Sequence, residues 1–303
     1  MIVLAVFFAV LGAASNAAGT AFQRRAAAGV ERGGGLALLR ALVRRPAWFA
    51  GIAGVTGAAV FQALALVNGP MALVQPVFVL ELPFALLIAV PLLHRRLPPA
   101  AWQAVAGVVA GLALLLGAAA PSGTRRQAAM EEWVPVLAVT LGVMAAAVAV
   151  ARVSSSPLVR AAVLAAGAAT GNALTAALMK SATGRLADDG LPAFFTSWQT
   201  YGFALTGVAA LLLLENALQT GPLVASQPAL TVGDASVSLL LGVTLFDEQV
   251  RTGWWLLPAA AGALLIVWGG VPAGPRGAPA GRCRALNRSP KGDRGERAHK
   301  TSG

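Results

Sequence analysis

Long apolar stretches constrain this chain more than any other feature of its sequence. A bilayer core about 30 Å thick is crossed by roughly 20 consecutive apolar residues in a helix. Nine stretches approach or exceed that length: 2–22, 48–67, 70–93, 101–119, 133–151, 157–178, 194–214, 222–246 and 253–270. They show no strand-like alternation, and charged residues make up only 12% of the chain. The sequence therefore predicts an all-α integral membrane protein with about nine transmembrane helices.

An internal duplication organises these stretches. Asn68-Gly69-Pro70 matches Thr220-Gly221-Pro222 at a separation of 152 residues, the difference between 220 and 68, and the register continues past Trp102 on Trp254. One extra stretch, 133–151, lies between the two copies, so the copies enter the membrane from opposite sides. The sequence predicts two inverted repeats, helices 1–4 and helices 6–9, joined by helix 5.

The duplication divides the chain into four expected parts. These are a first transmembrane repeat at 1–119, a connecting helix 5 at 120–156, a second repeat at 157–271 and a disordered basic tail at 272–303. Anionic lipid headgroups are the expected partner of the tail. Nucleic acid is a weaker alternative that we do not predict, because the basic residues lie outside the apolar stretches or at their ends. A homodimer is left open.

The basic residues also predict an orientation. Of the 23 Lys and Arg, 18 fall on the side of the tail, and five fall on the opposite side: Arg125, Arg126, Lys180, Arg185 and Arg251. The more basic side of a membrane protein is cytoplasmic. We therefore expect a multi-pass plasma-membrane protein with its N-terminus outside and its C-terminus in the cytoplasm.

Two glutamine–proline pairs occupy matching places in the copies. Gln75-Pro76 and Gln227-Pro228 follow the two Gly-Pro turns. A proline inside a helix leaves the carbonyl four residues earlier without its intrahelical donor, and in a membrane such a carbonyl needs protein, water or substrate. One interpretation is a paired polar substrate site. The alternative is that each proline simply starts its helix.

Two acidic residues lie deep in apolar stretches. Glu81 and Asp234 both fall near the expected membrane midplane, where a charged side chain costs at least about 2.5 kcal/mol. We expect a role in substrate binding or coupling, and proton coupling is open because loss of hydration favours the neutral carboxyl. Asp234 shares a helix face with Gln227, whereas a structural hydrogen bond is the stronger alternative for Glu81.

The remaining polar residues add one candidate and no reaction chemistry. Asn216, at the edge of the stretch 194–214, is expected to line an entrance to the substrate site. No set of nucleophile, base and orienting residue is visible, and no metal or cofactor site is predicted. The sequence does not indicate an enzyme. Gly107 and Gly111 form a small-residue pair that favours close helix packing.

The chain resembles the drug/metabolite transporter superfamily, of the EamA-like type. Its organisation is closest to the branch of NIPA-type magnesium transporters. The resemblance covers residues 1–270 and rests on Gln23-Arg24-Arg25, Trp48 with Gly51 and Gly57, Gly69-Pro70-Met71-Ala72-Leu73-Val74-Gln75-Pro76, Lys180, Asn216-Ala217-Leu218 and Leu245-Phe246-Asp247-Glu248. It implies a secondary carrier that moves a small solute by alternating access.

Two departures bear on the solute that this resemblance implies. Ala58 and the segment His94-Arg95-Arg96 stand where the magnesium branch has acids, and Mg²⁺ prefers carboxylate oxygens. We therefore expect a small organic metabolite as substrate. Divalent-cation transport is the first alternative, and a non-transporting membrane scaffold or partner subunit is the second.

Overall fold

The computed structural model describes residues 1–28, 45–93, 99–123, 125–220 and 223–270. The predicted tail at 272–303 lies outside these ranges. The described residues are almost wholly helical, and the only β-type pairing among them is an isolated antiparallel bridge between Ser122 and Gln249. The predicted all-α class is confirmed.

The helices follow the apolar stretches of the sequence closely. In chain order they are α1 (Ile2–Ala28), α3 (Pro46–Asn68), α4 (Met71–Phe78), α5 (Glu81–Leu93), α6 (Pro99–Ala119), α7 (Met130–Val153), α8 (Pro157–Thr196), α9 (Trp198–Thr220), α10 (Leu223–Phe246), the 3₁₀ helix η1 (Gly253–Trp255) and α11 (Leu256–Gly270). Both α3 and α4 begin 152 residues before α9 and α10 respectively, as the differences 198 − 46 and 223 − 71 give.

Eight segments of the described chain are long and apolar enough to cross a membrane, and Gly253–Gly269 forms a ninth, shorter apolar helix. Many large apolar side chains on these helices are exposed, among them Val139, Leu205 and Leu240. Such a surface is costly in water but ordinary against lipid. The protein is membrane-embedded.

Two helix predictions need correction. The stretch 70–93 contains a segment long and apolar enough to cross a membrane, Met71–Ile88, but it is not one continuous helix, because it is interrupted between α4 and α5. The helix predicted at 157–178 continues as far as the non-helical Gly190, and a short helical segment follows it to Thr196. The added turns carry Arg185, Asp188 and other polar residues, which interrupt an apolar pattern without breaking a helix. Gly190, at φ 82°, kinks this extension.

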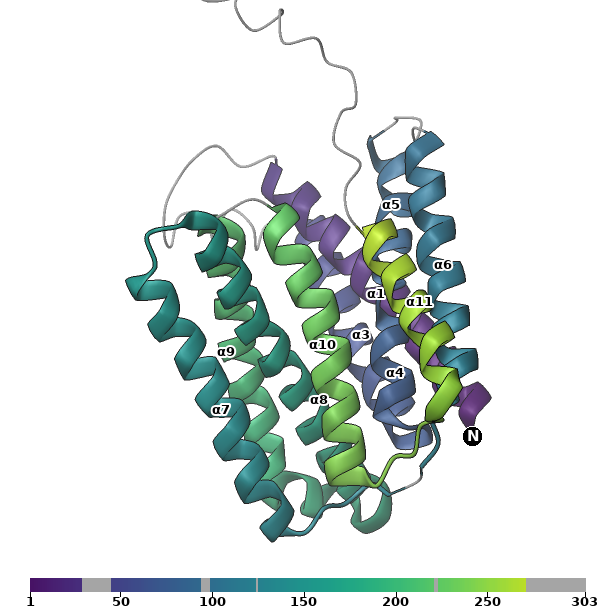
Figure 1. Cartoon of the computed structure of the whole chain (residues 1–303), viewed down its shortest axis with the longest axis vertical. Coiled ribbons are helices and arrows are strands. Elements are labelled where there is room, and N and C mark those ends of the chain that lie inside the picture. The colour runs from purple at the N-terminus through teal and green to yellow at the C-terminus, as the bar shows by residue number, and fades with distance from the viewer. Residues whose placement is uncertain (29–44, 94–98, 124, 221–222, 271–303) are drawn as a thin grey trace, which may run out of the picture. The chain divides into compact units, whose positions relative to one another are not determined.

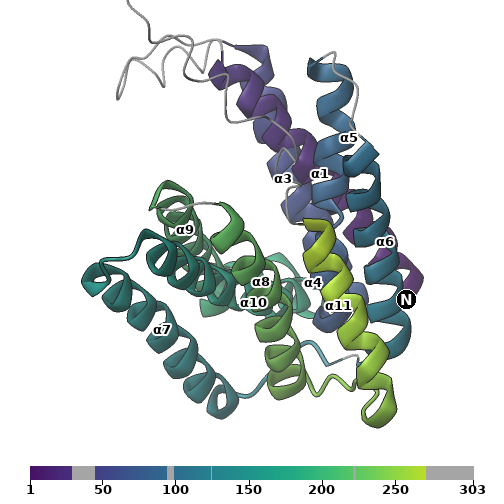
Figure 2. The same cartoon turned by 45° about the horizontal axis from the view of Figure 1, so that its top comes forward.

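Figures 1 and 2 show how the helices are grouped. Helix α8 packs against α7, α9 and α10, whereas α1 packs against α3 and α5, and α6 packs against α11. Between these groups lies α4, which contacts α10 on one side and α6 on another. The short helix α4 is therefore surrounded by protein.

Helices α6 and α11 cross at closely approaching backbones. A Cβ atom at Gly111 would lie 2.6 Å from the carbonyl oxygen of Gly262, and a Cβ at Gly262 would lie 2.6 Å from that of Gly111. A Cβ at Gly107 would lie 3.2 Å from the ring of Trp268. The small residues at 107 and 111 thus form the predicted close contact, and their partner helix is the matching helix of the second copy.

Candidate functional site

The centre of the candidate site is α4, whose residues Met71 to Val77 are all buried. This helix includes both Gln75 and Pro76. The Gln75 side chain is 6% exposed, and its amide nitrogen Nε2 has no hydrogen-bond partner among the described residues. A buried amide without a partner costs on the order of 1 to 3 kcal/mol. This position therefore calls for a ligand or a water.

The helix containing Gln75 ends abruptly at Phe78. The amides of Val79 and Leu80 donate to Pro76 and Val77, three residues back rather than four. Pro83 supplies no amide, and its ring crowds the carbonyl of Val79, so the α-helical pattern cannot run through this point. Irregular backbone within an apolar span is tolerated where it is enclosed by protein or lines a cavity.

Glu81 lies at this interruption, in the first turn of α5. The N-terminus of a helix carries a partial positive charge that favours an acidic side chain. The location thus supplies a structural reason for a carboxyl deep in an apolar stretch.

A second polar strip lies on α10. A Cβ atom at Gly242 would lie 3.7 Å from the amide nitrogen of Ala72, so this face of α10 contacts the start of α4. Ser238 and Asp234 precede Gly242 by four and eight residues and share that face. Because α4 starts where α10 ends, Gln75 lies roughly level with Ser238. We call Gln75, Ser238 and Asp234 the polar seam.

The polar seam is short of hydrogen bonds. Six buried side-chain polar atoms have no partner among the described residues, and three of them are Nε2 of Gln75, Oγ of Ser238 and Oδ1 of Asp234. Native proteins leave few buried polar groups unpaired. Three of them on two contacting helices mark a place suited to a polar solute.

Glu248, which follows α10, lies at the Gly242 end of the seam. Its carboxylate oxygens accept hydrogen bonds from the amides of Met71, at 2.6 Å, and Ala72, at 2.8 Å. Nζ of Lys180, on α8, lies 2.5 Å from Oε1 of Glu248 and 4.3 Å from the centroid of the Phe246 ring. Both charged side chains are at most 2% exposed. We call Lys180, Glu248 and the two α4 amides the Lys180–Glu248 clamp.

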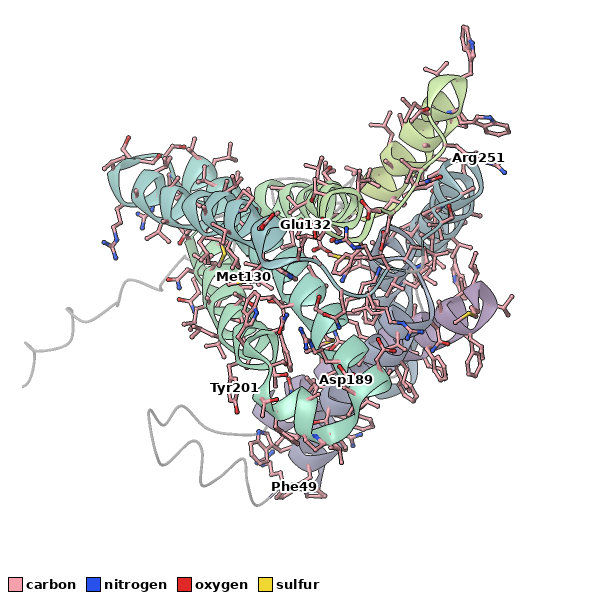
Figure 3. All side chains as sticks on the ribbon, turned by 90° about the horizontal axis from the view of Figure 1, so that it is seen from below. Phe49, Met130, Glu132, Asp189, Tyr201 and Arg251 are labelled. Carbon is pink, nitrogen blue, oxygen red and sulfur yellow. The ribbon has the colours of Figure 1, made fainter. Side chains whose placement is uncertain are left out.

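The chain between α10 and η1 is held in place beside the clamp. Ser122 and Gln249 exchange two backbone hydrogen bonds, at 2.9 and 2.8 Å, and Asp247 has the left-handed φ of 49°. Arg125 bonds both carboxylate oxygens of Glu132 and also contacts Asp247 at 2.7 Å. Figure 3 views this end of the molecule, with Glu132 near the middle of the view, between α7 and α10.

A small cavity of about 180 Å³ lies against Lys180. Other lining residues include Asn68, Pro70, Ser122 and Arg126. These residues belong to the connections at the Glu248 end of the helices, so this cavity and the polar seam lie on different sides of the clamp.

The structure brings together only some of the residues predicted from sequence. Gln75, Pro76 and Asp234 lie on the contacting helices α4 and α10. Asn216 does not join them, because it is exposed on α9 and its Nδ2 donates to the carbonyl of Leu212 at 2.7 Å. The side chains of Gln227 and Pro228 lie outside the described part of the structure.

Sequence reasoning missed the clamp and Ser238. Glu248 follows the end of α10, and Lys180 lies inside α8 but just past the end of the predicted stretch 157–178. Charged residues at the ends of predicted spans normally face water or headgroups. A usable signal was present, since Lys180 and the segment Leu245-Phe246-Asp247-Glu248 carry the family resemblance and only Asp247 separates Glu248 from an apolar stretch. Their pairing across 68 residues could not be deduced from one sequence.

Comparison with known proteins gives one clear relative. The chain is 30% identical over 271 residues to an uncharacterized protein of Corynebacterium glutamicum, across 87% of this chain and 92% of that protein. The two belong to one family. No family model and no solved structure matches the chain.

Proposed function

We propose that the protein is a secondary transporter that moves a small organic metabolite across the plasma membrane by alternating access. The observation that carries this proposal is the polar seam, whose three unpaired buried polar atoms lie on the contacting helices α4 and α10. Beside them the α4–α5 span is interrupted. Interrupted helices that expose backbone and polar side chains near mid-membrane are typical solute sites of secondary carriers.

The arrangement of the helices supports an inverted-repeat carrier of the drug/metabolite transporter type. Helices that occupy matching places in the two copies contact each other, since α4 meets α10 and α6 meets α11. The equivalent pairs α1–α3 and α8–α9 pack closely within each copy. In such a carrier the two copies rock about a site at their interface, and the polar seam lies between one helix of each copy.

The chemistry of the seam favours a solute with both donors and acceptors. Gln75 offers amide protons, Ser238 offers a hydroxyl and Asp234 offers a carboxyl oxygen. Lys180 already has Glu248 as its counter-ion, so the described seam presents no unpaired cation to a solute. These groups suit a small metabolite with an amine or hydroxyl donor better than a multiply charged anion.

The proposal is tested by uptake into proteoliposomes that contain the purified full chain. Metabolites of this class and divalent cations are screened in parallel. Gln75→Leu should abolish uptake of the active solute, because Leu removes the amide and is itself well tolerated in a membrane helix. The matched change Asn216→Leu should leave uptake within about twofold, because Asn216 bonds only its own helix in the described structure.

Three outcomes would contradict this proposal. Uptake of metal alone would favour the divalent-cation alternative, and full activity in Gln75→Leu would remove the seam from the transport path. Absence of uptake for every solute, in protein that is folded and inserted, would favour a scaffold.

A further inference from the structure

We propose that the Lys180–Glu248 clamp is a gate of the transport path, which must open for solute to pass between the polar seam and the Glu248 end of the molecule. This inference rests on the proposed transport function. It adds two functional residues, Lys180 and Glu248, and gives each a role.

The clamp joins three helices that a carrier would have to separate. Glu248 extends α10, the two amides begin α4, and Lys180 belongs to α8. Helix α4 belongs to the first copy and the other two helices belong to the second. Movement of one copy against the other therefore has to break these hydrogen bonds first.

The position of the clamp is that of a barrier rather than of a peripheral contact. Gln75 lies one turn beyond Met71 on α4, and Ser238 lies one turn before Gly242 on α10. The cavity of about 180 Å³ reaches Lys180 from the other side. A solute that travels between that cavity and the polar seam meets Lys180 and Glu248.

The chemistry also favours a reversible contact over a permanent one. Buried ion pairs are often no more stabilising than apolar residues of similar volume, because both charges lose hydration. A permanent join between two membrane helices needs only small apolar residues, as at Gly111 and Gly262. Charged groups, in contrast, regain water when the contact opens, so the open state is accessible.

Gly242 makes the closed state possible. A Cβ atom at this position would overlap Oε2 of Glu248. The absence of a side chain lets the Glu248 carboxylate reach the amide of Ala72. A larger residue at position 242 would keep Glu248 away from α4 and prevent the closed state.

The gate is tested by thiol labelling, which needs no substrate. In full-length protein that carries Cys283→Ser and Ser238→Cys, a membrane-impermeant methanethiosulfonate reagent is added to each side separately. Labelling of position 238 from the Ser122 side should be slow. Glu248→Gln should speed it by about tenfold or more, because the closed state loses its charged contact with Lys180. Lys180→Met should act in the same direction.

The control is Asp247→Asn, which removes the adjacent carboxylate that contacts Arg125 outside the clamp. Labelling of position 238 should stay within about twofold of the parent in this variant. Equal labelling rates in parent, Glu248→Gln and Lys180→Met would overturn the gate, whereas the transport proposal would still rest on uptake. Faster labelling of position 238 in Glu248→Gln and Lys180→Met, without uptake of any solute by the parent protein, would support the gate and contradict the transport proposal.

A second measurement leaves Glu248 unchanged, in case its replacement prevents folding. Ser122 and Gln249 form a hydrogen-bonded antiparallel pair, whose Cα atoms are typically about 5.5 Å apart, within disulfide range. Ser122→Cys and Gln249→Cys together should, once oxidised, abolish the slow labelling of position 238 from that side, and reduction should restore it. Unchanged labelling of position 238 after oxidation would overturn the gate, because solute access would then not require separation of Ser122 from Gln249.

Discussion

At the scale of single residues, Glu248 satisfies several groups at once. The first amides of a helix have no acceptor within the helix, and within an apolar span no water is present to accept their hydrogen bonds. Glu248 accepts hydrogen bonds from two of these amides on α4 and also supplies the counter-ion of Lys180. Removing any one member therefore leaves others buried and unpaired.

This dependence predicts an unequal effect of single and double changes. Lys180→Met should lower the free energy of unfolding by about 3 to 5 kcal/mol, because the Glu248 carboxylate stays buried without a counter-ion. The double change Lys180→Met with Glu248→Gln should recover much of the loss, since no buried charge remains. Thermal unfolding in detergent measures both. A double variant as unstable as the sum of the single variants would contradict this account.

The Asp234 carboxyl predicts how transport responds to pH. A carboxyl in a buried, apolar place favours its neutral form and is suited to exchange a proton during the cycle. If transport is proton-coupled, Asp234→Asn should abolish accumulation driven by a pH gradient and preserve substrate exchange. Uptake into proteoliposomes with and without the gradient measures the two separately. Parent-like accumulation in Asp234→Asn would leave the carboxyl with a structural role only.

At the scale of helices, most of the fold could be predicted, because bilayer thickness fixes the length of each span. The interruption after α4 was missed because the mean hydropathy of Met71–Ile88 stays high, although Pro76 and Pro83 stand within that run. The extension of α8 was missed for the opposite reason, because Arg185 and Asp188 end the apolar run while the helix continues. Hydropathy thus locates membrane segments better than it locates helix ends.

The α6–α11 crossing gives a prediction with a control in the same helix. Gly111→Ala should lower the unfolding temperature, because its methyl group would lie 2.6 Å from the carbonyl oxygen of Gly262 and force the helices apart. Gly117→Ala should be neutral or slightly stabilising, since a Cβ there meets nothing within 4 Å and Ala is the better helix former. Equal effects of the two changes would show that the crossing has no packing role.

At the scale of the whole molecule, the duplication predicts the topology and only part of the site. Gln75 and Asp234 were found from polar residues in apolar stretches, and they do lie on contacting helices. Asn216 was placed in the same site by its position at a span edge, and the structure leaves it on the exposed side of α9. Polar residues are common at the edges of spans, so a position at a span edge does not distinguish a site residue from an ordinary surface residue.

The orientation of the whole chain is the simplest prediction to test. The exposed residues Ser122 and Ser155 lie in loops at opposite ends of the spans, and Ser122→Cys and Ser155→Cys are made separately in protein with Cys283→Ser. The excess of basic residues predicts that position 122 labels in intact cells and that position 155 labels only after permeabilisation. The opposite pattern would reverse the orientation, and labelling of both in intact cells would contradict the assignment of α7 as a span.

The missing side chain at Gly242 has a consequence for the history of the family. Glu248 can reach α4 only where position 242 has no Cβ, and Lys180 can stay buried only where Glu248 neutralises it. These three positions should therefore change together during evolution. Relatives that have lost the acid at 248 are expected to carry a neutral residue at 180 and to admit side chains at 242, whereas relatives that keep the acid should keep the glycine.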